Sequence, residues 1–287
     1  MLTELVKNWP VTGELSVLTP TTWDIAGKYI LKRVGTEAGA RNNVRFSNVL
    51  RAHDVPVSQL LPTRDGGEYI ATPEGCYLLM EKLGGSHITD IFNRDYAAIA
   101  YQTGIIVARI HRALRTITDE PVKSTPFDLE LRGWIREALA GSELLKPEEW
   151  EEPIETLCGL YPQLPKQEIH RDIHYGNLLF EGNVLTGVLD FDLGKQDARL
   201  FDLAYFLLGQ LLGQRDLGAI EERWLVFARK FLEGYGMIAE LEESEIESLP
   251  LMMQCIEYLF IAFWYEQENK DAMEETLKIL RFIERVM

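Results

Sequence analysis

Three oxygen-bearing side chains lie close together between residues 168 and 192. Asp172 and Asn177 are five positions apart, and Asp190 follows two short apolar runs that the turn residues Glu181-Gly182-Asn183 separate. The pattern predicts a β-hairpin, whose antiparallel strands bring Asn177 and Asp190 together at its open end. Taken singly, each is typical of a turn cap or a solvated strand end. Carboxylate and amide oxygens suit Mg²⁺, so the joint spacing favours a magnesium site with Asp172 beside it.

The same segment carries a family resemblance. His170-Arg171-Asp172 with Asn177, then an apolar strand that ends in Asp190, resembles the catalytic and metal-binding loops of protein-kinase-like enzymes. His174 makes it more similar to the aminoglycoside phosphotransferase and choline kinase family, because protein kinases usually have Lys there. At Arg171 this small-molecule branch more often has Gly, so that residue departs from its pattern.

The resemblance implies an α+β, two-lobed protein-kinase-like fold with an antiparallel β N-lobe and a mainly helical C-lobe. We expect residues 1–80 to form a β-rich nucleotide-binding lobe and residues 81–85 to form the hinge. Residues 86–287 are then the helical catalytic and substrate lobe. At the hinge, backbone groups of Glu81 and Leu83 would contact the adenine of ATP, although the sequence alone shows only a strand-to-helix linker.

The resemblance also assigns roles within the catalytic segment. Asp172 would accept or orient the proton of the substrate hydroxyl, and Asn177 and Asp190 would hold Mg²⁺. The residues expected to support the loop are His170, His174 and Asp202, and the candidates for facing the substrate are Asp192 and Trp264. Local alternatives remain, because Asp202 also fits a helix cap, Asp192 a strand end, and Trp264 an ordinary core helix.

Lys32 lies in the apolar run Tyr29–Val34, where the two-residue period of a strand puts it on one face with Ile30 and Val34. By resemblance it would hold the α- and β-phosphates of ATP. Snorkelling from a half-exposed strand is the alternative. Protein kinases pair this lysine with a helix Glu, but the helix predicted from about residue 38 to 52 has none, which leaves Glu37 as a weak candidate.

Strand and helix patterns place the other elements. Strands are predicted at 14–18, 23–34 with a turn at 26–28, 68–72 and 75–80, and the loop at 19–22 is not glycine-rich. Helical periodicity follows, with breaks expected near Lys146-Pro147, Pro153 and Pro162. We expect an irregular connection from Gly194 to Leu200.

Composition and charge narrow the function classes. The formal charge of −16 argues against a nucleic-acid surface, which needs clustered Lys and Arg, and leaves a cationic substrate open. Three widely spaced cysteines, Cys76, Cys158 and Cys255, indicate neither a disulfide framework nor a zinc site. The first residues do not resemble a signal peptide, and no apolar run approaches about eighteen residues, so we expect a cytoplasmic protein with no membrane segment.

The predicted reaction is ATP- and Mg²⁺-dependent transfer of a phosphoryl group to a hydroxyl of a small molecule. The acceptor is open between an amino alcohol, an aminoglycoside-like antibiotic, homoserine and a sugar. A protein acceptor is disfavoured because the link from Asp190 to Asp202 is too short for an activation segment. The alternative is a nucleotide-binding pseudokinase or scaffold, which the missing helix Glu and the unusual loop at 19–22 motivate. The oligomeric state stays open.

Overall fold

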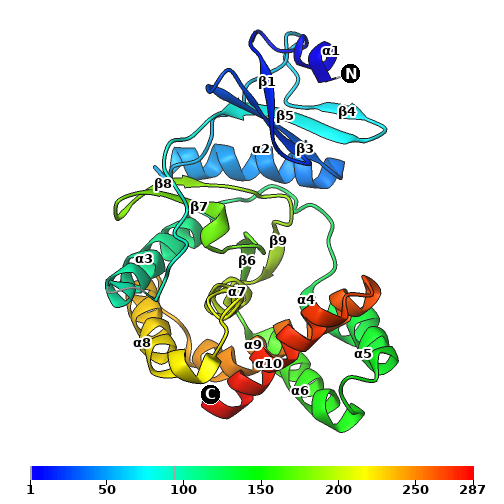
Figure 1. Ribbon diagram of the computed structural model, residues 1–287, viewed down its shortest axis with the longest axis vertical. Coiled ribbons are helices and arrows are strands. Elements are labelled where there is room, and N and C mark those ends of the chain that lie inside the picture. Colours follow the sequence, from blue (N-terminus) through cyan, green and yellow to red (C-terminus); the bar gives the residue numbers. More distant parts are fainter. Residues whose placement is uncertain (1, 93–94) are drawn as a thin grey trace. The chain divides into compact units, whose positions relative to one another are not determined.

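The computed structural model describes residues 2–92 and 95–287, which form two compact units (Figure 1). The first unit is assembled from Met1–Thr89, Ala113–Val122 and Tyr175–Gly194. The second is assembled from Asp90–Arg112, Lys123–His174 and Lys195–Met287. Each unit therefore combines segments that are far apart in the sequence.

A five-stranded antiparallel sheet in the order β1-β2-β3-β5-β4 dominates the first unit (Figure 1). Its strands are β1 (Leu15–Thr19), β2 (Thr22–Ile25), β3 (Tyr29–Val34), β4 (Ile70–Thr72) and β5 (Gly75–Glu81). The turn between β2 and β3 has positive φ at both Ala26 (54°) and Gly27 (71°), the geometry that matches the twist of a two-residue hairpin. The strands predicted in the first eighty residues are thus confirmed.

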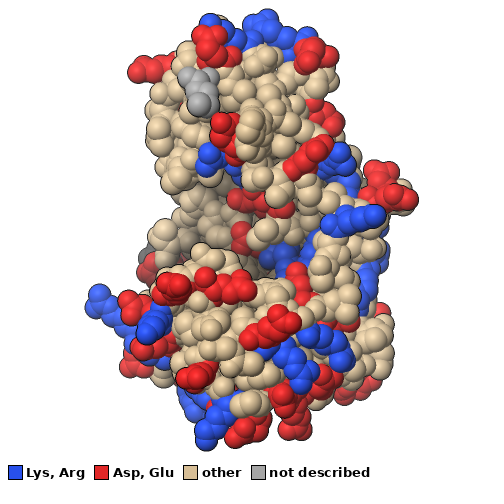
Figure 2. All heavy atoms as spheres, turned by 90° about the vertical axis from the view of Figure 1, so that its right-hand side faces the viewer, with Lys and Arg blue, Asp and Glu red and all other residues tan. Residues whose placement is uncertain are grey.

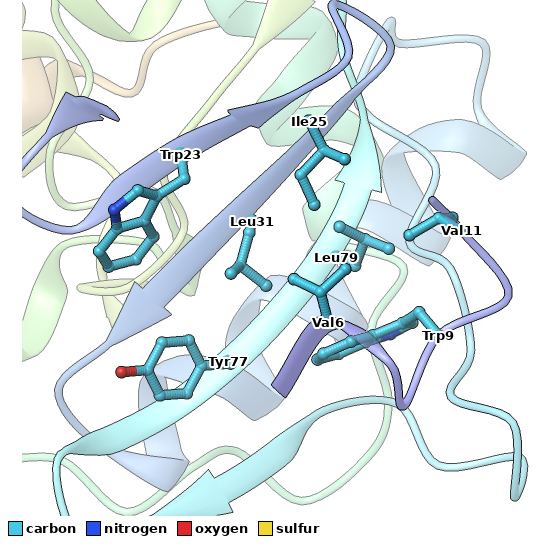
Figure 3. Close-up of a cluster of buried hydrophobic side chains, with 8 residues drawn as sticks. All are labelled: Val6, Trp9, Val11, Trp23, Ile25, Leu31, Tyr77 and Leu79. Carbon is cyan, nitrogen blue, oxygen red and sulfur yellow. The ribbon is translucent and has the colours of Figure 1, made fainter. Parts of the chain in front are cut away.

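The N-terminal segment, with α1 (Leu2–Val6), covers one face of this sheet. Figure 3 shows the buried cluster there, in which Trp9 lies against the sheet residues, and its members are Val6, Trp9, Val11, Trp23, Ile25, Leu31, Tyr77 and Leu79. The indole of Trp9 is fully buried, and its nitrogen donates to the carbonyl of Leu61 at 3.0 Å. Burial of the largest side chain therefore leaves no unpaired donor.

Helix α2 (Glu37–Ala52) packs on β3 and β5 through a second cluster. Its members are Val34, Ala40, Val44, Cys76 and Leu78. The helix begins where the hydroxyl of Thr36 accepts the amide of Gly39 at 3.1 Å, as an N-cap should. Because side chains alternate along a strand, Leu31 faces the first cluster and Lys32 faces the same side as Val34.

The predicted hairpin is formed by β7 (Leu178–Glu181) and β8 (Val184–Val188), with Gly182 at φ 59° in its turn. Leu178 pairs with Val188, and the amide of Leu189 donates to the carbonyl of Asn177 at 2.9 Å. The predicted meeting of Asn177 and Asp190 at the open end is therefore supported by the backbone, because Leu189, the residue before Asp190, is bonded to Asn177.

The second unit is mainly helical (Figure 1). Its helices are α3 (Tyr96–Leu114), α4 (Phe127–Glu130), α5 (Arg136–Ser142), α6 (Pro147–Leu160), α7 (Leu200–Gly209), α8 (Leu217–Gly236), α9 (Glu243–Glu266) and α10 (Lys270–Val286), with a π-helical turn at Leu131–Ile135 and 3₁₀ turns at Tyr161–Gln163 and, in the first unit, Tyr175–Asn177. Helix α9 packs against α5, α6, α7 and α10. It forms the centre of this unit.

Two predictions about the second unit are wrong. The segment from Gly194 to Leu200 is not irregular, because Lys195–Ala198 form β9 and pair with β6 (Lys166–Ile169). Nor does Pro153 interrupt a helix, since α6 runs through it. Proline removes the donor to the carbonyl of Glu149, four residues earlier, and the hydroxyl of Tyr258 on α9 donates to that carbonyl instead at 2.7 Å.

Two observations concern the surface and α9. On the face drawn in Figure 2, acidic and basic side chains are interspersed. Ion pairs of the second unit include Arg136 with Glu151 at 3.2 Å and Arg285 with Glu221 at 2.7 Å. Among the described helices, α9 alone has the length and apolar composition to span a membrane, and the same properties are typical of a helix at the centre of a folded domain.

Candidate active site

Lys32 and Asp190 are in contact within the first unit. The Nζ of Lys32 donates to Oδ1 of Asp190 at 2.9 Å and to Oδ1 of Asp192 at 2.5 Å, and its side chain is 13% exposed. Burial pushes the pKa of Asp190 up, but the charge and hydrogen bond of Lys32 outweigh it, so this pKa lies below its usual range. Asp190 is therefore ionised at neutral pH, as a metal ligand must be.

Asp192 is placed differently from what the sequence suggested. Its carboxylate accepts from Lys32 and, at 2.7 Å, from Nδ2 of Asn43 on α2, so it is directed at the lysine rather than outward. The prediction that Glu37 is the partner of Lys32 is wrong. Glu37 instead accepts from Arg41 and from the Tyr69 hydroxyl, each at 2.7 Å. We call Lys32, Asn43, Asp190 and Asp192 the Lys32 cluster.

Helix α2 holds the backbone of the segment that carries both aspartates. The side-chain Nδ2 of Asn42 donates to the carbonyl of Gly194 at 2.5 Å, and the ring centre of Phe46 lies 5.8 Å from that of Phe191. A Cβ on Gly39 would lie only 3.2 Å from the carbonyl oxygen of Asp192. The close approach of α2 thus depends on glycine at this position and fixes the aspartates relative to Lys32.

The oxygen ligands proposed for magnesium fit a hard divalent cation. Asn177 directly precedes β7 and Asp190 lies two residues after the end of β8, beside the pair Leu178 and Val188, and the side chain of Asp190 remains 40% exposed. Within residues 2–92 and 95–287 no cluster of three or more His, Cys, Asp or Glu could bind a metal. A site with an amide oxygen and a carboxylate suits Mg²⁺, which keeps water and phosphate oxygens as its other ligands.

At the predicted hinge, Glu81 presents only one free backbone group. The backbone amide of Lys82 donates to the carbonyl of Lys28 at 2.9 Å. Hydrogen-bonded and non-hydrogen-bonded pairs alternate along antiparallel strands, so the next pair, Tyr29 and Glu81, is not hydrogen-bonded. The amide of Glu81 points the other way and donates to Gln59 at 2.9 Å. An adenine could therefore contact the carbonyl of Glu81, not its amide. The role of Leu83 stays a prediction.

Asp172 lies in the second unit with two partners. Its Oδ1 accepts the hydroxyl of Tyr205 on α7 at 2.5 Å, and Nε2 of His174 lies 3.6 Å away. Burial raises the pKa of Asp172, but the hydrogen bonds from His174 and Tyr205 outweigh it, and the pKa lies below its usual range. We call Asp172, His174 and Tyr205 the Asp172 cluster. It holds an ionised carboxylate in one orientation.

Asp202 supports the backbone of the loop that carries Asp172. Its two carboxylate oxygens accept the amides of His170 and Arg171, both at 2.8 Å, and one also lies 3.1 Å from Nε2 of His111. The N-cap of α7 is Arg199, so Asp202 is not the cap. His111 in turn contacts the hydroxyl of Tyr235 at 2.9 Å. These are the hydrogen bonds that a loop-supporting role requires.

Arg171 fills the position where the resembling family usually has Gly. Its φ of 70° is the conformation that favours Gly, yet its side chain is buried. The guanidinium lies 3.7 Å from the centre of the Phe201 ring and pairs with Glu130 at 2.5 Å. Stacking and the ion pair thus connect the loop that carries Asp172 to α4 and α7.

Sequence reasoning missed Asn43 and Tyr205. Neither belongs to a motif, and each acts through a partner more than thirty positions away, as the separation of 33 between Tyr205 and Asp172 illustrates. Trp264 lies on α9, half-buried beside Phe263, whose ring centre is 4.8 Å away. No local pattern in the sequence indicates the contacts of Asn43 or Tyr205.

Solved structures share this fold. The amicoumacin kinase hAmiN in complex with AMP-PNP, Ca²⁺ and Ami superposes with a TM-score of 0.73 at 17% identity, covering 99% of this chain and 91% of that one. The microcompartment-associated aminopropanol kinase has a TM-score of 0.70 at 16% identity, covering 99% and 96%. The fold is therefore the protein-kinase-like α+β fold of small-molecule kinases, as predicted.

The sequence shows the family directly. Residues 18–242 match the "Phosphotransferase enzyme family", and the chain belongs to that family. Homoserine kinase of Zymomonas mobilis subsp. mobilis is 25% identical over 225 residues, which cover 75% of this chain and 66% of that protein. Homoserine kinase of Pseudomonas aeruginosa is 28% identical over 222 residues, with the same coverage. The match thus spans slightly under two thirds of these relatives.

Proposed function

We propose that this protein is an ATP- and Mg²⁺-dependent phosphotransferase that moves the γ-phosphoryl group to a hydroxyl of a small, amine-bearing molecule. The observation that carries the proposal is the 2.9 Å contact between Lys32 and Asp190. These are the residues expected at the phosphates and at the metal, and they come from segments 158 positions apart. A chain without this function has no evident need to bring them together.

Each residue has a defined task in this reaction. Lys32 binds the α- and β-phosphates, and the carbonyl of Glu81 with Leu83 contacts the adenine. Asn177 and Asp190 hold Mg²⁺, which neutralises charge on the phosphates when bound. Asp172 orients the acceptor hydroxyl and accepts its proton. Because the transition state of phosphoryl transfer is loose, a carboxylate with a low pKa is sufficient, since orientation matters more than basicity.

The names of the relatives support an amine-bearing acceptor. Homoserine and aminopropanol each carry an amino group and a hydroxyl a few bonds apart, and kinases for both are similar to this chain. A further structural neighbour is the amicoumacin kinase. An amino alcohol or a hydroxy amino acid is the acceptor class that we put first, ahead of a neutral sugar.

A coupled ADP-release assay with Mg²⁺ and ATP tests the proposal. The panel contains 1-amino-2-propanol, ethanolamine, choline, homoserine, kanamycin and glucose. We expect acceptor-dependent ADP release with at least one amine, and a loss of at least a hundredfold in Asp172→Asn with nucleotide binding retained. Nucleotide binding with no ADP release across the panel would favour the scaffold alternative. The contacts of Lys32 with Asp190 and Asp192 provide acidic partners without a helix Glu, which removes one of the two reasons for that alternative.

A further inference from the structure

Glu257 on α9 is a buried carboxyl group without a partner. It is 3% exposed, and in the part of the chain that the structure describes no hydrogen bond or ion pair reaches its carboxyl. Other buried acids of the second unit have partners. Glu245 pairs with Arg199 at 2.5 Å, and Asp202 accepts two backbone amides. Glu257 is thus an exception that packing alone does not account for.

Helical spacing puts Glu257 on the same side of α9 as Phe260, which contacts Tyr205 of the Asp172 cluster. Residues 257, 260 and 264 are spaced i, i+3 and i+7, so Glu257, Phe260 and Trp264 share one face of the helix, which we call the α9 stripe. The ring of Phe260 lies 5.9 Å from that of Tyr205. The hydroxyl of Tyr205 in turn donates to Asp172 at 2.5 Å, so the stripe is two contacts from the proposed catalytic carboxylate.

Burial changes along the stripe. Glu257 is almost fully buried, whereas Phe260 and Trp264 are half-buried. A ligand that contacts the two aromatic rings would therefore meet Glu257 at the inner end. An isolated buried carboxyl is costly, and the cost is recovered when a cation becomes its partner. Aromatic faces attract cations as well, so the chemistry of the stripe selects a positive group.

We propose that Glu257 binds the ammonium group of the acceptor, with Phe260 and Trp264 in contact with the same cation. The proposal rests on the proposed function, and it narrows the acceptor to a short molecule that carries an ammonium group a few carbon atoms from its hydroxyl. The ammonium lies on the α9 stripe while the hydroxyl is at Asp172. A neutral polyol of the same size lacks the group that Glu257 recognises.

Proton balance gives this interaction a distinctive signature. Burial raises the pKa of Glu257 well above its usual range, which favours the protonated carboxyl in the free protein. An ammonium ligand favours the carboxylate, and the proton then passes from Glu257 to the buffer while the ammonium keeps its own. No covalent bond of the ligand forms or breaks. Binding should therefore release protons, as linkage to this carboxyl requires.

Titration calorimetry at pH 7 in two buffers of different ionisation enthalpy measures this proton release. The ligands are two pairs that differ at the amine: 1-amino-2-propanol with propane-1,2-diol, and homoserine with 4-hydroxybutanoate. The proteins are the wild type, Glu257→Gln and, as a matched control, Glu266→Gln, which changes an exposed acid on the same helix. Glutamine keeps the shape of Glu257 and removes its charge.

We expect the wild type and Glu266→Gln to bind at least one amine tenfold or more tightly than its counterpart, with proton release. Glu257→Gln should lose both the preference and the proton release, and its melting temperature should equal or exceed that of the wild type. Equal binding within both pairs, or an unchanged preference in Glu257→Gln, would overturn the proposal. If that variant does not fold, the wild-type preference and proton release decide alone.

Parallel ADP-release measurements separate this proposal from the proposed function. Amine binding with proton release but without ADP release would refute phosphotransfer and leave the ammonium site standing. ADP release that is equally efficient with propane-1,2-diol and 1-amino-2-propanol would refute the ammonium site and leave phosphotransfer standing.

Discussion

The Nζ of Lys32 lies 2.5 Å from Oδ1 of Asp192, which joins a strand of the N-terminal sheet to a carboxylate 160 residues later. Asn43 donates to the same oxygen at 2.7 Å, so α2 contributes an amide where protein kinases contribute a glutamate. The lysine is thus positioned by the segment that also carries the proposed metal ligand Asp190. Phosphate binding and metal binding should therefore respond together to changes in α2.

Replacing Asn43 with Ala tests that coupling. The variant removes one hydrogen bond to Asp192, worth about 1 kcal/mol, so we expect ATP affinity to fall about fivefold. Calorimetry with and without Mg²⁺ measures the change. Asn48→Ala on the exposed side of the same helix is the control and should bind ATP as the wild type does. Equal affinities for both variants would show that Asn43 does not position Lys32.

Asp190→Asn should abolish the dependence of ATP binding on Mg²⁺, because an amide cannot neutralise the cation. The backbone tolerates the change, since Asp190 has φ 62° and Asn readily adopts that conformation. Asp54→Asn, at φ 56° and exposed, controls for the backbone. Calorimetric titrations of ATP with and without Mg²⁺ provide the measurement. If Mg²⁺ still strengthened ATP binding in Asp190→Asn, the metal site would have to lie elsewhere.

Tyr205→Phe should move the acid limb of the pH profile for turnover. The pKa of Asp172 is below the usual value of an aspartate, so the side chain stays ionised to lower pH than an ordinary aspartate does. The stability that the ionised form contributes is likewise lost only as the pH falls through this lowered pKa. Removing the Tyr205 hydrogen bond raises the pKa, which shifts loss of activity to higher pH. A kcat profile between pH 3.5 and 8 measures this, and superimposable profiles would contradict it.

Arg171→Gly separates backbone strain from side-chain contacts. Glycine relieves about 1 kcal/mol of strain at φ 70°. It also removes the 2.5 Å ion pair with Glu130 and the stacking on Phe201, a loss of about 3 kcal/mol, while Lys195 still lies 3.1 Å from Glu130. We expect a net destabilisation of about 2 kcal/mol in denaturant unfolding. Glu143→Gly, at φ 54° with an exposed side chain, should instead be stabilising by about 1 kcal/mol. Stabilisation by both changes would mean that the Arg171 contacts contribute little.

Gly39→Ala should weaken both stability and nucleotide binding. The new Cβ would lie 2.7 Å from Cγ1 of Val34 and 3.2 Å from the carbonyl oxygen of Asp192, and overpacking of this kind costs about 1–3 kcal/mol. Gly159→Ala on α6 meets open space and should be neutral or slightly stabilising. Melting temperatures and ATP titrations compare the two. An unaffected Gly39→Ala would show that α2 can withdraw without loss.

Much of this fold could be predicted from local sequence patterns. The alternation in Tyr29–Val34 placed Lys32 correctly on its face, and the turn at 181–183 identified the hairpin that aligns Asn177 with the end of β8. Both are properties of a few neighbouring residues. The predicted roles of Asp172, Asn177 and Asp190 remain proposals, because hydrogen bonds and burial show where a residue lies but not what it binds.

Long-range contacts could not be predicted in this way. Nothing near Asn43 indicates that its amide reaches Asp192, which lies 149 positions later. β6 and β9 were missed for the same reason, since Lys195–Ala198 is polar in sequence and becomes a strand only by pairing. The expectation of a break at Pro153 was wrong because the compensating hydroxyl comes from another helix.

That hydroxyl has a consequence for folding order. The carbonyl of Glu149 finds its donor, Tyr258, only after α9 has packed on α6, so α6 cannot complete its hydrogen bonding by itself. Local helix formation and tertiary docking are thereby a single event in this region. Backbone amides on α6 and α9 should exchange with deuterium at a common rate in the wild type and at separate rates in Tyr258→Phe.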